Sequence, residues 1–155
     1  MSTLFADLVG FTSMGEELDI EDVGRTLAVY HGLARRELER FGGTVEKFIG
    51  DAVVGIFGAP ASHEDDAERA VRAALAIQEA ARTRRADDPG FTVHVRVGVN
   101  TGEALVALHA NAHAGEGLAA GDAVNTAARL QAVAPVDGVL VGEVTYRATS
   151  RVIRY

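Results

Sequence analysis

Apolar residues along this chain follow two different spacings, which predict strands and helices in turn. Residues 3–9 form a nearly continuous apolar run, which is typical of a strand in the middle of a sheet. Residues 44–49 and 52–58 predict two more strands, and the glycine-aspartate pair between them is a hairpin signal. Residues 91–99 alternate apolar and polar side chains, which predicts a strand with one buried face.

Three helices are predicted between these strands. The first begins at Asp19 as its N-cap and ends at the glycines 42–43. The second follows Ser62 and Asp65, which resemble a capping box, and continues to about residue 86. The third spans residues 122–133. The apolar positions of the first helix are spaced by three and four, at Val23, Leu27, Tyr30, Ala34, Leu38 and Phe41, with His31 expected on its outer face.

Shorter segments complete the pattern. Residues 10–15 and 109–120 are expected to be loops, and residues 103–108 and 138–141 to be short strands. The last dozen residues predict a short helix and the start of a strand. Because the early hairpin requires antiparallel pairing, the chain is expected to be α+β, with a mixed, largely antiparallel sheet flanked by helices.

Composition narrows the class of protein. The 155 residues suffice for one domain (1–155) with a buried core, and the chain contains no cysteine. No apolar run is long enough to cross a membrane and no signal peptide is recognisable, so we expect a cytoplasmic protein without membrane contact. The net charge of −7 argues against a nucleic-acid partner. The abrupt start before an apolar strand suggests a domain cut from a longer protein.

Two aspartates occupy unusual places in this pattern. Asp7 lies within the first apolar run, and Asp51 lies at the turn between the two hairpin strands. An ionised carboxylate in such surroundings needs a partner or a metal, and two of them beside a glycine-rich turn could hold Mg²⁺ against a triphosphate. The alternative is that both are ordinary turn or cap residues, which is a reasonable interpretation for Asp51 after Gly50.

Asn125 and Arg129 lie four residues apart on the third predicted helix, so they share one face. An amide and a guanidinium there could fix a ribose oxygen and stabilise charge on a phosphoryl group. The pattern by itself favours an ordinary solvated helix face. His109 and His113 flank Asn111 in a predicted loop, where solvated histidines are a better interpretation than a metal site.

Three blocks of sequence resemble one known family. The segments FADLVGFTS, KFIGDAVVGIFGAP and GDAVNTAARLQ are similar to the first metal-binding strand, the second metal-binding strand and the catalytic helix of the class III nucleotide cyclases. They occur in the family's order and extend over nearly the whole chain. The resemblance implies a ferredoxin-like core, cyclisation of ATP to 3′,5′-cyclic AMP and pyrophosphate, two Mg²⁺ or Mn²⁺ ions per site, and a head-to-tail homodimer.

The resemblance also assigns roles to residues. Asn125 would orient the ribose and Arg129 would stabilise the transition state. The metal ligands would be Asp7, Asp51 and the backbone carbonyl of Leu8. Phosphates would be bound by the turn Gly10, Phe11 and Thr12 and by Arg96, although Arg96 could equally be an exposed residue of an alternating strand.

Lys47 and Leu118 occupy the positions that read the base in this family. Lysine goes with adenine, because an ammonium donates to the N1 acceptor of adenine, whereas the N1 of guanine is itself a donor. Leu118 departs from the family, whose adenylate cyclases usually carry aspartate or threonine there as an acceptor for the amino group. The chain also stops at Tyr155, before a phosphate-binding lysine of the family, so truncation at the C-terminus is a further expectation.

These departures leave alternatives open. One is a catalytically weak or inactive nucleotide-binding module that signals by dimerisation, and another is a guanylate cyclase. The related diguanylate cyclases would require a Gly-Gly-Asp/Glu-Glu-Phe hairpin, whereas the hairpin here reads Ile-Gly-Asp-Ala.

Overall fold

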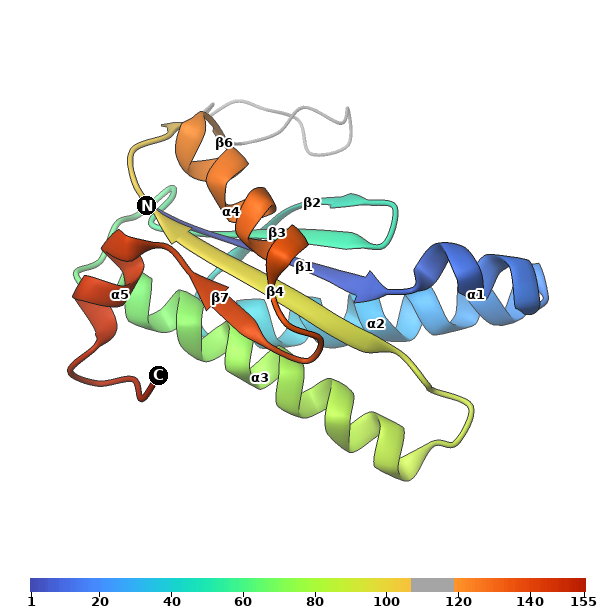
Figure 1. Ribbon diagram of the computed structural model, residues 1–155. Coiled ribbons are helices and arrows are strands. Elements are labelled where there is room, and N and C mark those ends of the chain that lie inside the picture. Colours follow the sequence, from blue (N-terminus) through green and yellow to red (C-terminus); the bar gives the residue numbers. More distant parts are fainter. Residues whose placement is uncertain (107–118) are drawn as a thin grey trace.

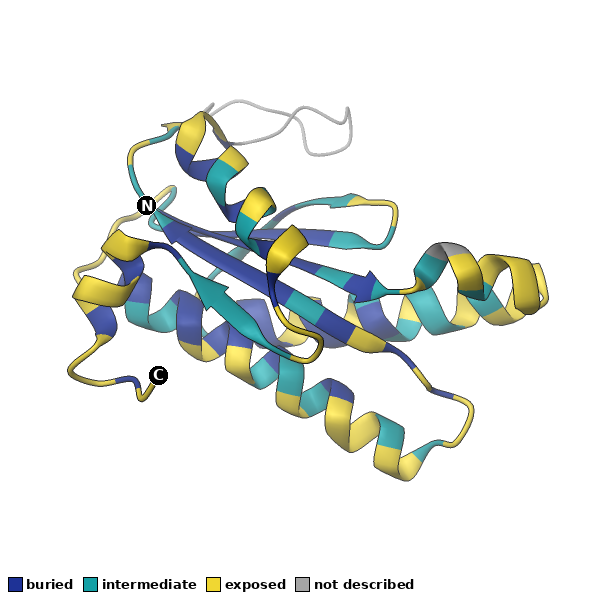
Figure 2. Ribbon diagram, viewed as in Figure 1, coloured by how far each residue is buried: buried dark blue, intermediate teal, exposed yellow. Residues whose placement is uncertain are grey.

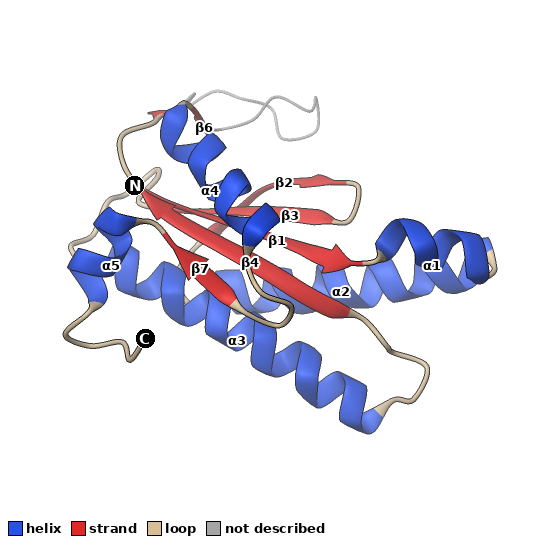
Figure 3. Ribbon diagram, viewed as in Figure 1, coloured by secondary structure: helices blue, strands red, loops and turns tan. Residues whose placement is uncertain are grey.

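The computed structural model describes residues 1–106 and 119–155 and has the α+β architecture predicted from the sequence (Figures 1 and 3). A five-stranded sheet has the order β2-β3-β1-β4-β7, and β5 and β6 form a separate pair. The strands are β1 (Ser2–Val9), β2 (Thr44–Ile49), β3 (Ala52–Phe57), β4 (His94–Thr101), β5 (Leu105–Val106), β6 (Ala119–Ala120) and β7 (Val139–Val141). The helices are α1 (Phe11–Glu17), α2 (Ile20–Arg40), α3 (Asp66–Asp87), α4 (Asp122–Val133) and α5 (Glu143–Thr149).

Strand β1 is the centre of the sheet. It pairs antiparallel with β3 on one side and with β4 on the other, while β2 and β3 form the predicted hairpin. Only β7 is parallel to its neighbour, β4. The sequence β1-α2-β2-β3-α3-β4 with this strand order is the split βαβ arrangement of ferredoxin-like folds, so the predicted fold class is confirmed.

The two faces of the sheet are covered differently. Helices α2 and α3 pack on one face, and α4 lies on the other (Figure 1). The larger core forms beneath α2 and α3, where alternate strand residues meet the helices; its strand members include Leu4, Ala6, Leu8, Val53, Phe57, Val95, Val97 and Val99. Figure 2 shows the strands largely buried and the outer sides of the helices exposed.

Helix α4 lies unusually close to the strand beneath it. Strand β4 carries Gly98 at the contact, and a Cβ atom there would clash with the backbone carbonyl of Ala127 and the backbone nitrogen of Gln131. Asn100, two residues along the same face, donates from its side-chain amide to the carbonyl of Ala123 at 3.1 Å. The absence of a side chain at Gly98 therefore lets α4 lie close to β4, and the hydrogen bond from Asn100 attaches the helix to the same strand.

The structure corrects several predicted boundaries. The expected loop 10–15 is mostly helix α1, because Phe11 and Met14, three residues apart, pack against the core. Strand β4 begins at His94 and not at residue 91. The expected loop 109–120 contains β6 at its end, and residues 150–155 form no strand.

The predicted capping box before α3 is also wrong. The helix begins at Asp66 with Asp65 as N-cap, and no side-chain capping bond forms there. Hydrogen bonds run instead to Asp66, which accepts from the backbone N–H of His63 at 2.8 Å and from the Ser62 hydroxyl at 3.3 Å.

Candidate functional site

Asp7 is a half-buried carboxylate on the α4 face of β1, directly opposite Arg96 of β4. Burial, followed by the negative charge of Asp51, raises the pKa of Asp7 from 3.8 to about 6. Arg96 and a hydrogen bond from Gln131 of α4 act in the opposite direction and only partly offset these effects. Asp7 therefore lies in a place where its own charge is poorly compensated.

Asp51 reaches the same place from the β2–β3 turn. Its Oδ2 accepts a hydrogen bond from the backbone N–H of Leu8 at 3.2 Å, which joins the turn to the end of β1. The turn itself is sharp, since Gly50 has a φ of 59°, a conformation that favours glycine. The two aspartates singled out from sequence are thus neighbours, brought together by the pairing of β1 with β3.

This pair of carboxylates suits a divalent cation. The charge of Asp51 raises the free energy of ionised Asp7, and a hard cation with oxygen ligands would remove that repulsion. Within residues 1–106 and 119–155, no group of three or more histidine, cysteine or acidic side chains converges. A cation held by Asp7 and Asp51 would therefore need further ligands from backbone, water or a bound phosphate. The role predicted for the Leu8 carbonyl stays a prediction.

Two residues of α2, Tyr30 and His31, lie near the aspartates and were not identified as site residues from the sequence. Tyr30 is completely buried, and burial followed by the charges of Asp7 and Asp51 raises its pKa well above the usual value. His31 packs its ring against Phe48 of β2, with centroids 4.3 Å apart, so the outer-face prediction for His31 is wrong. Burial lowers the pKa of His31, and hydrogen bonding to the Gly50 backbone opposes this. Both residues lie close enough to the site for its charges to act on them: Asp7 and Asp51 act on Tyr30, and Asp51 acts on His31.

The predicted phosphate-binding residues lie close to the end of β1 in sequence or register. Gly10 has a φ of 73° and precedes the first turn of α1, in which Phe11 is half-buried and Thr12 follows it. Arg96 is half-buried, and its Nε has no hydrogen-bond partner among the described residues. Arg96 lies opposite Asp7, and an unpaired guanidinium nitrogen there suits an anionic ligand, so the interpretation of Arg96 as merely an exposed residue is not supported.

Asn125 and Arg129 are both exposed on α4, which matches their expected common face. The guanidinium of Arg129 donates to the Thr126 hydroxyl at 3.0 Å. It forms no ion pair with any acidic side chain in the described part of the chain. Within one chain these two residues are therefore not joined to Asp7 and Asp51.

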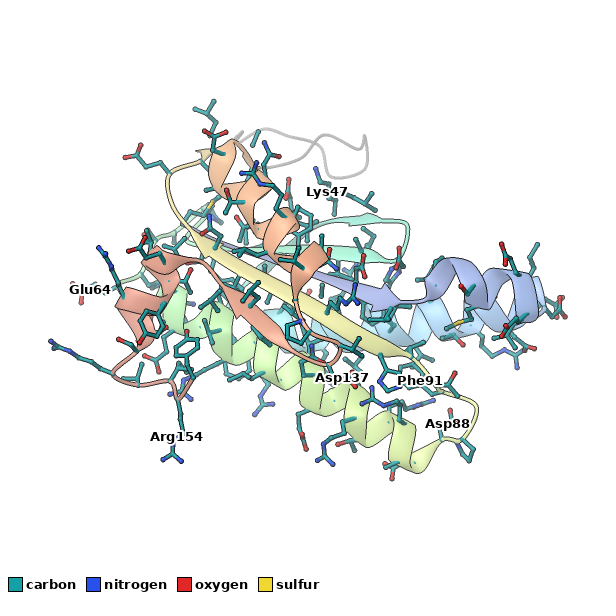
Figure 4. All side chains as sticks on the ribbon, viewed as in Figure 1. Lys47, Glu64, Asp88, Phe91, Asp137 and Arg154 are labelled. Atoms are coloured by element: carbon teal, nitrogen blue, oxygen red, sulfur yellow. The ribbon has the colours of Figure 1, made fainter. Side chains whose placement is uncertain are left out.

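Lys47 lies on β2, and Figure 4 shows it on the side of the sheet where α4 lies. Its Nζ is 3.8 Å from Oε1 of the neighbouring Glu46, a buried residue that sequence reasoning missed. Its position could have been noticed in the sequence, because Glu46 is an acidic residue within a predicted strand. Leu118, His109 and His113 lie outside the described residues.

One hollow of the described surface lies away from the predicted site residues. A groove of about 470 Å³ between α2 and α3, on the other face of the sheet, contains none of the predicted site residues. No helix in the described part of the chain has the length and apolarity needed to span a membrane.

Comparison with known proteins places this geometry in context. A family model described as adenylate and guanylate cyclase catalytic domain matches residues 1–153. Adenylate cyclase 1 of Rhizobium meliloti is 32% identical over 136 residues, which cover 84% of this chain and 20% of the relative. This chain therefore spans only a small part of that relative.

Solved structures agree with the family match. The adenylyl cyclase CyaB from P. aeruginosa has a TM-score of 0.85 at 28% identity, covering 99% of this chain and 81% of the other. The monomeric guanylyl cyclase domain from the aquatic fungus Blastocladiella emersonii has a TM-score of 0.85 at 26% identity, covering 97% and 84%. Proteins described as adenylate cyclases and proteins described as guanylyl cyclases are thus both similar to this chain.

Proposed function

This chain belongs to the adenylate and guanylate cyclase catalytic domain family, and we propose that it converts ATP to 3′,5′-cyclic AMP and pyrophosphate. The observation that carries the proposal is the pair Asp7 and Asp51. Two adjacent carboxylates, one on β1 and one in the β2–β3 turn, with the pKa of Asp7 raised to about 6, are a costly arrangement that a divalent cation would stabilise. Mg²⁺ or Mn²⁺, two per site by resemblance, would neutralise the triphosphate and activate the ribose hydroxyl.

The site is proposed to form between two copies of the chain. Asn125 and Arg129 are exposed on α4, and among the described residues neither forms a hydrogen bond or ion pair with the aspartates of its own chain. A head-to-tail homodimer would bring Asp7 and Asp51 of one copy opposite Asn125 and Arg129 of the other. A two-fold symmetric pairing of this kind creates two equivalent sites.

The chain's own residues would act as follows. In the reaction the ribose 3′-oxygen bonds to the α-phosphorus, the bond to pyrophosphate breaks, and the hydroxyl proton passes to solvent. Asn125 would hold a ribose oxygen so that the attacking hydroxyl points at the phosphorus. Arg129 would stabilise the negative charge that grows on the α-phosphate and the leaving group. Gly10, Phe11 and Thr12, with Arg96, would bind the remaining phosphates.

Base selection is assigned to Lys47, which donates to N1 of adenine. Exchange of Lys47 for glutamate replaces this donor by an acceptor and adds a negative charge near phosphate. We therefore expect Lys47→Glu to lower kcat/KM for ATP relative to GTP by on the order of tenfold or more. An unchanged ATP/GTP ratio would mean that Lys47 does not read the base.

The decisive experiment is a product assay. Purified protein is incubated with ATP or GTP and with Mn²⁺ or Mg²⁺, and cyclic nucleotides are separated by chromatography. Cyclic AMP formed in preference to cyclic GMP supports the proposal. Preference for GTP would identify a guanylate cyclase, and nucleotide binding without either product would identify a regulatory module.

A further inference from the structure

Glu46 is a buried carboxylate with one oxygen left unpaired. Its side chain is 0% exposed, whereas the neighbouring Lys47 side chain is 36% exposed. Oε1 accepts a hydrogen bond from the backbone N–H of Ala119 at 3.2 Å and lies 3.8 Å from Lys47 Nζ. Oε2 is buried and has no hydrogen-bond donor among the described residues. Because a buried, unpaired carboxylate oxygen is costly, a donor from outside the described chain would stabilise it.

An irregularity in β2 directs this carboxylate to the α4 face. The pairing of β2 with β3 shifts register between Val45 and Lys47, so Glu46 has no partner residue on β3. Bulges of this kind re-aim side chains and are frequent beside active sites. Glu46 reaches β6 at Ala119, whereas Phe48, two residues later, packs on His31 of α2 on the opposite face. Glu46 and Lys47 therefore lie together on the α4 face.

The two side chains form a matched donor and acceptor. Lys47 can only donate, and an ionised Glu46 can only accept. Adenine presents the complementary pair on one edge, with N1 as acceptor and the 6-amino group as donor. The Lys47 side chain is 36% exposed and its Nζ lies 3.8 Å from Oε1 of Glu46, so a base edge that contacts this ammonium lies next to the carboxylate.

We propose that Glu46 determines base specificity by accepting a hydrogen bond from the 6-amino group of adenine while Lys47 donates to N1. This inference rests on the proposed cyclisation of ATP and extends it. The Glu46 carboxylate would be the acceptor for the 6-amino group that the Leu118 side chain cannot provide. Glu46 and Lys47, both on β2, would thus bind the base together. The hydrogen bond from Ala119 to Glu46 would attach the segment before α4 to the same strand.

The test removes the acceptor and the amino group separately. Glu46→Gln keeps the side-chain size, and its carbonyl oxygen can still accept from the Ala119 N–H, but the second oxygen becomes an amino group that cannot accept. The ligands are ATP and purine ribonucleoside triphosphate, which lacks the 6-amino group. For each protein the two are compared by kcat/KM and, independently of turnover, by displacement of a fluorescent ATP analogue in the presence of Mn²⁺.

Wild type should prefer ATP over the purine analogue by on the order of tenfold or more, as expected for a hydrogen bond to a charged group. Glu46→Gln should lose this preference. The matched control is Glu37→Gln, which alters an equally buried glutamate of α2 that pairs with Arg36 and Arg40 on the other side of the sheet. The control should keep the wild-type preference even if its stability falls.

Three results would overturn the inference. Glu46→Gln could weaken both ligands equally, which would indicate that Glu46 only ties β2 to β6. It could leave the preference unchanged. With GTP added as a third ligand, it could weaken GTP and spare ATP, which would assign the carboxylate to a guanine N–H group. If wild type makes no cyclic nucleotide, the proposed function fails, and the displacement ratios still decide the role of Glu46.

Discussion

The two faces of the central sheet are made from alternate residues of the same strands, but their chemistry differs. On β1, Leu4, Ala6 and Leu8 enter the core beneath α2 and α3, whereas Phe5 and Asp7 lie on the α4 face. On β4, Val97 belongs to the same core. One face is closed by two long helices and is almost entirely apolar. The other is covered by one helix of 12 residues, which leaves space for charged side chains and for a ligand.

This difference indicates that stability and chemistry are separated across the sheet. The α2/α3 face contains the larger core cluster, including the fully buried Tyr30, Leu38 and Ile77. The α4 face contains a smaller cluster of Ile56, Ala119 and Val124. It also carries the candidate site residues that lie within strands, namely Asp7, Lys47 and Arg96. Changes to the charged residues of the α4 face are thus expected to alter activity more than folding, and changes to the apolar core of the other face to do the reverse.

The largest expected effect is loss of activity when either aspartate is removed. Asp7→Ala or Asp51→Ala should abolish cyclisation and leave a folded protein, since each removes one of the two carboxylates proposed to hold the cation, and the charge of Asp7 is poorly compensated in the folded chain. Activity is measured by the product assay and folding by circular dichroism. The control is Asp22→Ala, an exposed aspartate of α2 paired with Arg25, which should retain activity. Activity within about tenfold of wild type, or about 1.4 kcal/mol of barrier, would reject the metal role.

The second prediction concerns the composite site. Mixing an Asp7→Ala chain with an Arg129→Ala chain should restore activity that neither has alone, because one interface site of the mixed dimer carries both changes and the other carries neither. Random pairing gives about a quarter of wild-type activity, since half of the dimers are mixed and each has one intact site. If gel filtration of tagged chains shows mixed dimers and the mixture stays inactive, the shared site is wrong.

A matched pair of glycines compares the packing of the two faces. Gly98→Ala would place a Cβ against the backbone of α4, which cannot easily move, whereas Gly55→Ala would meet only the flexible side chain of Leu38 beneath α2. We expect Gly98→Ala to lower the free energy of unfolding by about 3 kcal/mol and Gly55→Ala by about 1 kcal/mol. Urea unfolding followed by circular dichroism measures both. Equal losses would show that α4 can shift away from the sheet.

The smallest expected effect is on stability as a function of pH. Asp7 has a folded-state pKa raised to about 6, so its stabilising contribution is present below its unfolded value near 4 and is lost as the pH rises through 6. In EDTA at pH 7, Asp7→Asn should therefore be more stable than wild type. Allowing for the partial exposure of Asp7, the difference is on the order of 1 kcal/mol. Urea midpoints at pH 4 and pH 7 test this, and a difference that does not shrink at pH 4 would contradict it.

Local patterns predicted much of this molecule. The apolar run of β1, the hairpin around Asp51 and the alternation in β4 specify strands, and the placement of Asp7 within an apolar run already indicated a site. Helix α1 was missed because its apolar residues, Phe11 and Met14, span only one turn, too little for periodicity to identify. The capping residue of α3 was misplaced because several polar residues there compete for the same backbone groups.

What the sequence determined by itself is the set of elements and the identity of the charged residues that do not suit them. Hydrophobic spacing is local, and so is the conflict between a carboxylate and an apolar strand. Tertiary structure alone decided which of these residues meet. The pairing of β1 with β3 joins Asp51 to Leu8, and the bulge in β2 turns Glu46 toward Ala119. Such contacts depend on strand order and register, which no short segment encodes, because they follow from the packing of the whole sheet between its helices.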